Sequence, residues 1–273
     1  MFFMDDIDDS VGMLLRDACA RHVMPRFGRL RQDEIEEKSS PTDLVTVADR
    51  EAEMFLAPRL RELIDGEIIG EEACASNPDI RGHAGAPVAW TIDPVDGTGN
   101  FVKGNDRFCC MVALLEEGRP VRSWIYLPIQ DRLYSAKAGG GAFVTSGDGV
   151  RKRLGLVSRD WQTDDMTGSA NVLAVEGPHR DIVRQRLCDL PGRWFAGSGG
   201  FMGTEIASGR EQFLLHSPCT PWDHAPVDLL CREAGGHAAM IDDSAAFHAG
   251  YARAFMIAPD RRAWRALRDR IWV

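Results

Sequence analysis

Two aspartates, Asp93 and Asp96, flank a proline and a valine in the stretch "WTIDPVDGTGNF", residues 90–101. Like charges at this spacing repel one another unless a cation lies between them. The pair Glu71-Glu72 precedes them by about twenty residues, and Asp223 follows in "PWDHAP". Carboxylate oxygens are the ligands that Mg²⁺ prefers, and a shared carboxylate can bridge two ions about 4 Å apart. The acids therefore predict a magnesium site.

The segment Gly97-Thr98-Gly99 follows the second aspartate directly and precedes an expected helix start at residues 100–103. Glycine turns and helix N-termini present free backbone N–H groups that hold phosphate well. Acids for a metal beside amides for a phosphate indicate phosphoryl chemistry. Each motif alone has a plainer interpretation, because DxxDG is a common turn and a Glu-Glu pair is a common solvated loop.

Strand ends are expected to position these acids. "GEIIGEE" predicts a short buried strand that ends at Gly70, and "PVAWTID" predicts another over residues 88–92 that ends at Asp93. Residues 105–158 contain β-rich runs separated by Gly, Pro and Asp turns, which is typical of an antiparallel meander. Helices and strands alternate beyond residue 170. The sequence therefore predicts an α/β fold with mixed and antiparallel sheets.

Apolar periodicity predicts helices before and after the β-rich region. The predicted helices cover residues 7–23, 48–63, 179–188, 200–208, 223–234 and 260–270. Pro58 lies inside the second of them, so a kink or a split is expected there. Further strands are expected in "EQFLLHS", "HAAMI" and "ARAFMIAP". We expect a single unit over 1–273, subdivided near 1–165 and 166–273.

The composition narrows the choice of partners and compartment. The 273 residues carry a net charge of −9, which disfavours a nucleic-acid or anionic-membrane partner. No apolar run approaches the roughly 20 residues of a membrane span, and the acidic N-terminus is unlike a secretory signal. Seven cysteines without CxxC spacing predict reduced, mostly buried thiols in a cytoplasmic protein.

"DPVDGTGNF", "GEE" and "WDHAPVDLLCREAGG" together resemble the inositol monophosphatase family of metal-dependent, lithium-sensitive phosphatases. "KSSPTDLVTVAD" is similar to that family's mobile active-site segment. The likeness covers roughly residues 6–260 by motif order. It implies a layered α/β/α/β/α sandwich, a homodimer and a Mg²⁺-dependent phosphomonoesterase that hydrolyses a small phosphorylated metabolite by direct attack of water.

The resemblance also implies a role for each matching position. The first Mg²⁺ is expected at Glu71, Asp93 and the Val95 carbonyl, and the second at Asp93, Asp96 and Asp223. A third ion would lie near Glu71 and Glu72. Water activation and phosphate binding are expected from Asp49, Thr98, Gly97 and Asp96, with Glu71 also catalytic, and Lys38 is expected on the mobile loop. Lithium inhibition is implied at the second metal site.

Substrate contacts are expected from Gly197, Ser198, Gly199, His216 and Asp223. Asn100-Phe101 resembles the inositol-phosphate branch, so inositol 1-phosphate is the first substrate hypothesis. The family's inositol-phosphate enzymes place a glutamate where this chain has His216, and a histidine lacks the bidentate acceptor that suits vicinal hydroxyls. Histidinol phosphate, fructose 1,6-bisphosphate and nucleotides such as 3'-phosphoadenosine 5'-phosphate or NADP therefore stay open as substrates. His216 could instead simply end a strand.

The sequence contains two further signals, and one alternative function stays open. "GSGGFMG" departs from GxGxxG by one residue, which disfavours dinucleotide binding through that motif. His224 could support the metal site, but its place in the first turn of a helix favours an exposed histidine. A regulatory binding protein on a phosphatase scaffold is the alternative from another functional class, and a complete set of metal ligands argues against lost activity.

Overall fold

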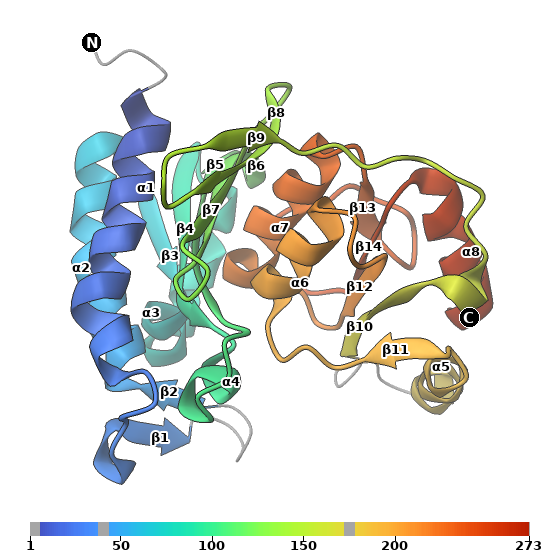
Figure 1. Cartoon of the computed structure of the whole chain (residues 1–273), viewed down its shortest axis with the longest axis horizontal. Coiled ribbons are helices and arrows are strands. Elements are labelled where there is room, and N and C mark those ends of the chain that lie inside the picture. Colours follow the sequence, from blue (N-terminus) through green and yellow to red (C-terminus); the bar gives the residue numbers. More distant parts are fainter. Residues whose placement is uncertain (1–5, 38–43, 172–177, 273) are drawn as a thin grey trace.

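The computed structural model describes residues 6–37, 44–171 and 178–272, which form helices and sheets stacked in five layers (Figure 1). The helices are α1 (Asp6–Ala18), α2 (Val47–Leu63), α3 (Glu71–Ser76), α4 (Thr98–Val102), α5 (Pro178–Cys188), α6 (Gly199–Ala207), α7 (Pro221–Glu233) and α8 (Arg261–Ile271). Tighter or wider helical turns cover Cys19–Val23, Met24–Arg26, Gln32–Glu34, Pro78–Gly85 and Thr163–Asp165.

A seven-stranded sheet follows the order β3-β4-β5-β6-β7-β8-β9. Its strands are β3 (Glu67–Gly70), β4 (Val88–Asp96), β5 (Cys109–Glu116), β6 (Arg119–Leu127), β7 (Arg132–Lys137), β8 (Gly141–Ser146) and β9 (Arg151–Arg153). Strands β3 and β4 are parallel, and every later pair is antiparallel. The predicted antiparallel meander is therefore confirmed in β5 to β9.

A second sheet of five strands follows the order β11-β10-β12-β14-β13. Its strands are β10 (Thr167–Asn171), β11 (Gly192–Trp194), β12 (Phe213–His216), β13 (His237–Met240) and β14 (Phe255–Ala258). Strand β10 is parallel to both of its neighbours, whereas β14 is antiparallel to β12 and β13. A separate antiparallel ribbon joins β1 (Ile35–Glu37) and β2 (Leu44–Thr46) just before α2.

Three apolar cores separate the layers. Helices α1 and α2 cover one face of the seven-stranded sheet, where Trp90 and Trp124 stack with ring centroids 5.9 Å apart. Helices α6 and α7 lie between the two sheets and share a core with both. Helices α5 and α8 cover the outer face of the five-stranded sheet. The expected α/β/α/β/α sandwich is confirmed, and Figure 1 shows these layers in order from α2 to α8.

Two expectations at the element level need correction. Helix α2 runs without a break from Val47 to Leu63, although Pro58 lies inside it. The packed face of Ala52, Leu56 and Leu60 is continuous across the proline, and burial of that face outweighs the loss of one backbone hydrogen bond. Strand β4 continues past Asp93 to Asp96, with an irregularity in its pairing between these residues.

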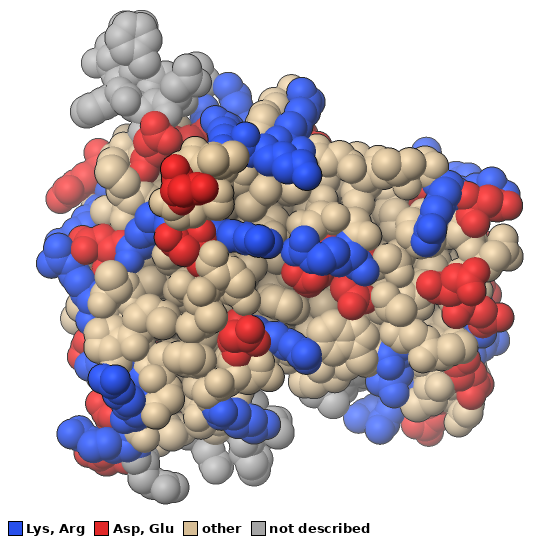
Figure 2. Space-filling model, in the orientation of Figure 1, with Lys and Arg blue, Asp and Glu red and all other residues tan. Residues whose placement is uncertain are grey.

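Six of the seven cysteines are buried and Cys188 is exposed, as the composition predicted for most of them. Within the described residues, no helix is long and apolar enough to cross a membrane. Acidic and basic side chains are interspersed over the face of the molecule shown in Figure 2.

Candidate metal centre

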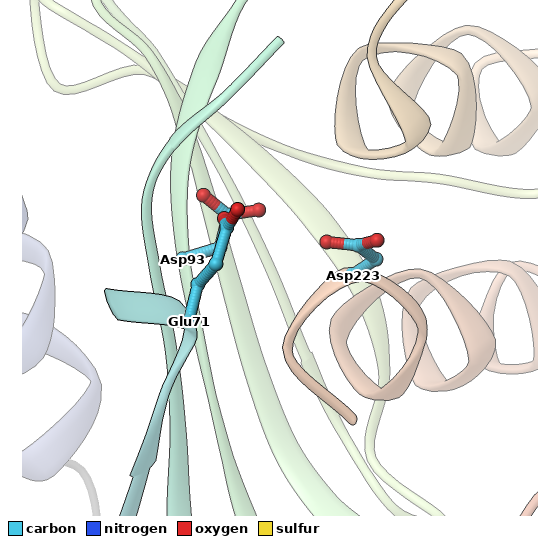
Figure 3. A group of neighbouring side chains, drawn as sticks. All are labelled: Glu71, Asp93 and Asp223. Atoms are coloured by element: carbon cyan, nitrogen blue, oxygen red, sulfur yellow. The ribbon is translucent and has the colours of Figure 1, made fainter. Parts of the chain in front are cut away.

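Three acids that are remote in the sequence meet where β3 ends, within β4 and at the start of α7. Glu71, Asp93 and Asp223 each offer one carboxylate oxygen, and these oxygens lie within 4.8 Å of one another (Figure 3). The parallel pairing of β3 with β4 sets Gly70 beside Ile92, so the acids that follow these two residues, Glu71 and Asp93, lie side by side. Asp223 faces the pair from the first turn of α7.

This carboxylate group is electrostatically unfavourable when it is fully ionised. The Asp93 side chain is buried, and burial together with the charges of Glu71, Asp96 and Asp223 raises its pKa well above the usual aspartate value. A divalent cation between the three carboxylates would offset both the repulsion and the desolvation. The donors are all oxygens, which is the ligand set that suits Mg²⁺, so the residues fit the implied metal.

Asp96 is directed toward α6 and is not a member of the three-carboxylate group. Its carboxylate accepts hydrogen bonds from the Ser198 hydroxyl at 2.5 Å and from the backbone N–H groups of Gly199 at 3.2 Å and Gly200 at 2.6 Å. Burial, followed by the charge of Asp223, raises the pKa of Asp96 to about 6. The carboxylate therefore joins the N-terminus of α6 to the end of β4.

Thr98 and Asp49, for which the family resemblance implies water activation, lie within hydrogen-bond distance of each other. The Thr98 hydroxyl lies 3.3 Å from Asp49 Oδ1 and 3.0 Å from the Val95 carbonyl oxygen. Asp49 Oδ2 accepts hydrogen bonds from the Thr46 N–H at 2.8 Å and the Thr46 hydroxyl at 2.6 Å, which closes a capping box at the start of α2. The cap fixes a buried carboxylate beside Thr98.

An open cavity of about 160 Å³ connects these groups. Most of its lining is acidic side chain or glycine backbone, which is suited to a metal and a phosphate rather than to an apolar ligand. Its lining residues are Leu44, Glu71, Asp93, Val95, Asp96, Gly97, Thr98, Gly99, Gly197 and Asp223. Gly97 has φ +91° and precedes α4, which begins at Thr98, two residues earlier than expected.

Not all of the other predicted residues line this cavity. Gly197 lines it, whereas Ser198 and Gly199 contact Asp96 instead. Glu72 is buried on α3, outside the three-carboxylate group, and His216 ends β12. Lys38 falls outside the described residues.

His224 is buried rather than exposed, so the expectation of a surface histidine is wrong. Its Nε2 lies 3.0 Å from His216 Nδ1, and its Nδ1 lies 2.9 Å from the Thr220 backbone nitrogen. The first turn of α7 packs under the five-stranded sheet, and the ring meets Phe255 edge to face. Burial lowers the pKa of His224 to about 4, and burial with the neighbouring His224 lowers that of His216 to about 3.

Glu53 is a functional neighbour that the sequence did not reveal. Its buried carboxylate accepts hydrogen bonds from the backbone N–H groups of Glu72 at 2.8 Å and Ala73 at 2.9 Å. It thereby caps α3 from the middle of α2 and holds the segment that carries Glu71. Only the helical spacing of Glu53 on the packed face of α2, next to Ala52 and Leu56, could have suggested a buried acid.

Comparison with known proteins decides the family. The sequence pattern of the inositol monophosphatase family matches residues 9–267 of this chain. The chain belongs to the inositol monophosphatase family. Its members are phosphoric monoester hydrolases that depend on a metal, and the three-carboxylate group lies where their motifs occur in this sequence.

Several members of this family resemble the chain at similar levels. Inositol-1-monophosphatase of Bacillus subtilis is 30% identical over 239 residues, covering 85% of this chain and 84% of that protein. Histidinol-phosphatase of Mycobacterium tuberculosis is 31% identical over 253 residues, covering 91% and 93%. The solved structure of extragenic suppressor protein suhB from Bartonella henselae superimposes with a TM-score of 0.80 at 22% identity, covering 97% and 98%. The last likeness supports the fold alone.

Proposed function

We propose that this protein is a Mg²⁺-dependent phosphomonoesterase for a small phosphorylated metabolite, with its active site at Glu71, Asp93 and Asp223. The observation that carries the proposal is the convergence of these three carboxylates beside the Thr98–Asp49 pair. When bound, Mg²⁺ would lower the pKa of water and neutralise phosphate oxygens. The Val95 carbonyl and Asp96 complete the ligands for two ions in this proposal, and lithium sensitivity is part of it.

The chain's own residues would position the reactants. The Thr98 hydroxyl donates to Asp49 or Val95, so its lone pairs are available to accept a hydrogen bond from the attacking water. The backbone of Gly97 and Thr98 lines the cavity and would hold the phosphate oxygens. Phosphoryl transfer depends mainly on such positioning and on charge stabilisation, so no covalent intermediate is required.

The substrate hypotheses follow from the names of the relatives. Inositol 1-phosphate is the first hypothesis because several relatives are named inositol-1-monophosphatase. Histidinol phosphate is the second, since the Mycobacterium tuberculosis relative carries that name. One solved relative of 22% identity is complexed with NADP and Ca²⁺, so nucleotide phosphates are included in the panel.

The Asp93→Asn variant tests the proposal. It removes the carboxylate at the centre of the group, and we expect Mg²⁺-stimulated phosphate release to fall at least about 10³-fold while circular dichroism is unchanged. Phosphate release is measured across a panel of inositol, histidinol, sugar and nucleotide monoesters. Asp65→Asn, an exposed acid before β3, is the matched control and should retain activity. Wild-type rates in the Asp93→Asn variant would refute the proposed site.

A further inference from the structure

A second cavity lies on the seven-stranded sheet where α6 ends, and we call it the α6 groove. Its volume is about 310 Å³, within the range of small-ligand sites, and none of its lining residues lines the metal cavity. Alternate residues of β7, β8 and the β9 segment form its floor, because alternate side chains of a strand share one face. Cross-strand pairing sets Tyr134 beside Val144 and Val144 beside Lys152. Ser208 and Arg210, which follow α6, complete the lining.

The floor of the α6 groove carries two cations that no described carboxylate neutralises. Arg132 and Lys152 are exposed and form no ion pair within residues 6–37, 44–171 and 178–272. Of the acids near them in the sequence, Asp131 pairs with Arg16, and Asp148 accepts hydrogen bonds within the turn that follows β8. The whole chain has a net charge of −9, so two uncompensated positive charges in one groove favour an anionic ligand there.

The groove also contains a buried hydroxyl group with a hydrogen to donate. Tyr134 is only 1% exposed, and its hydroxyl oxygen lies 3.4 Å from Arg210 Nη2, which donates to it. Glu205 fixes that guanidinium, because Arg210 Nε and Nη2 also donate to its two carboxylate oxygens at 2.7 and 2.6 Å. No described residue accepts the Tyr134 hydrogen, although buried polar groups usually have a partner. A ligand oxygen in the groove would supply this acceptor.

Part of the groove lining is apolar. Val144 and Leu154 are half-buried, whereas Val150 is 62% exposed. A single exposed aliphatic side chain is common on protein surfaces, but this one adjoins two further apolar residues and the two cations. A ligand whose carbon body covered the three side chains would gain free energy from the burial of apolar surface. The groove therefore suits an anion with an apolar part better than a small inorganic ion.

We propose that the α6 groove binds a small phosphate ester at a site separate from the metal cavity. The phosphate group lies between Arg132 and Lys152, which extend from strands about 10 Å apart, and it accepts the Tyr134 hydrogen. A phosphate carries up to two negative charges and three acceptor oxygens, which matches two cations and one hydroxyl donor better than a carboxylate does. The carbon part of the ester covers the apolar side chains. This site does not depend on the proposed phosphatase function.

Isothermal titration calorimetry of the EDTA-treated full chain tests the proposal. Without a metal, the clustered carboxylates of the metal cavity repel anions, so binding there does not obscure the groove. Phenyl phosphate carries both a phosphate and an apolar ring, whereas inorganic phosphate and phenol each carry only one of them. We expect phenyl phosphate to bind once per chain, about tenfold more tightly than either control compound. Absence of phenyl phosphate binding up to about 10 mM would refute the site.

Substitutions in the groove locate the bound phosphate. Arg132→Gln and Lys152→Gln should each raise the Kd for phenyl phosphate about tenfold, because each removes one charge-assisted hydrogen bond. Arg151→Gln is the matched control, since Arg151 neighbours Lys152 on β9 but packs over the Phe143 ring, on the opposite face of the sheet. It should leave the Kd unchanged, and circular dichroism checks the fold of each variant. An unchanged Kd in both groove variants, or equal weakening by Arg151→Gln, would overturn the proposal.

Discussion

The Thr98 hydroxyl has one hydrogen and two acceptors within reach, Asp49 Oδ1 and the Val95 carbonyl oxygen. Both acceptors are buried, and Asp49 is further fixed by the capping box of α2. The hydroxyl is therefore oriented with its lone pairs away from these acceptors. An oriented acceptor beside a metal site lowers the cost of removing a proton from water.

Substitution of Thr98 tests this role. Thr98→Ala removes the hydroxyl, and we expect kcat to fall about 10²-fold while KM changes little, since the hydroxyl contacts the water rather than the substrate. Thr98→Ser keeps the hydroxyl and should retain most of the rate. Phosphate release under saturating Mg²⁺ gives both constants for each variant. An equal kcat in wild type and Thr98→Ala would remove the residue from the mechanism.

The residue types could be predicted from the sequence, but their hydrogen-bond partners could not. Clustered carboxylates repel one another and need a cation to stabilise them, so Glu71, Asp93 and Asp223 could be predicted as metal ligands. Asp96 lies more than 100 residues before the Ser198 and Gly200 groups that it accepts from, and no local pattern encodes that contact. The prediction that His224 is exposed was wrong for a related reason, because its burial depends on a sheet that packs over α7.

Strand and helix ends position the site. Local sequence signals predicted some of these ends and missed others. The β3 strand, the meander and α7 followed from apolar runs and turn residues. The extension of β4 to Asp96 did not, because Pro94 and the two aspartates oppose strand formation locally. Pairing with β5, which resumes at Asp96 after the irregularity, overrides that preference. Gly97 then reverses the chain into α4 with a positive φ.

Gly97→Ala tests how tightly this turn is held. A β-carbon on Gly97 would lie 2.9 Å from both the Arg107 carbonyl oxygen and Ser198 Cβ, in a left-handed conformation. We expect a loss of about 3 kcal/mol in the free energy of unfolding, with loss of activity. Gly104→Ala, also left-handed but in open space, should cost only about 1 kcal/mol. Urea unfolding measures both, and equal losses would contradict the close packing.

At the scale of the whole molecule, the metal site joins two layers. Asp93 belongs to the seven-stranded sheet and Glu71 directly follows its strand β3, whereas Asp223 belongs to α7, which lies between the sheets. A cation held by all three would therefore couple the helix layer to the sheet. Without a metal, these acids must either stay ionised, which costs free energy because buried like charges repel, or take up protons.

The contribution of these carboxylates to the stability of the metal-free protein should consequently fall as pH rises. The unfolded value for aspartate is about 3.9. In the folded protein burial, with the charge of Asp223, raises the pKa of Asp96 to about 6, and burial raises that of Asp93 well above its usual range. A raised folded pKa means that the folded state binds protons more tightly. This contribution is complete below about pH 4 and is lost progressively through about pH 6 and above.

Mg²⁺ should reverse this loss, because it favours the ionised carboxylates. We expect the rise in Tm on adding Mg²⁺ to the EDTA-treated protein to be larger at pH 8 than at pH 5. At 100 times Kd it should reach about 5–10 °C, from about 2.7 kcal/mol of binding free energy. Differential scanning calorimetry at matched ionic strength measures it. Asp93→Asn should lose the Mg²⁺ shift and, without metal at pH 8, melt above the wild type. A Mg²⁺ shift of equal size at pH 5 and pH 8 would contradict ionisation of this carboxylate group as its source.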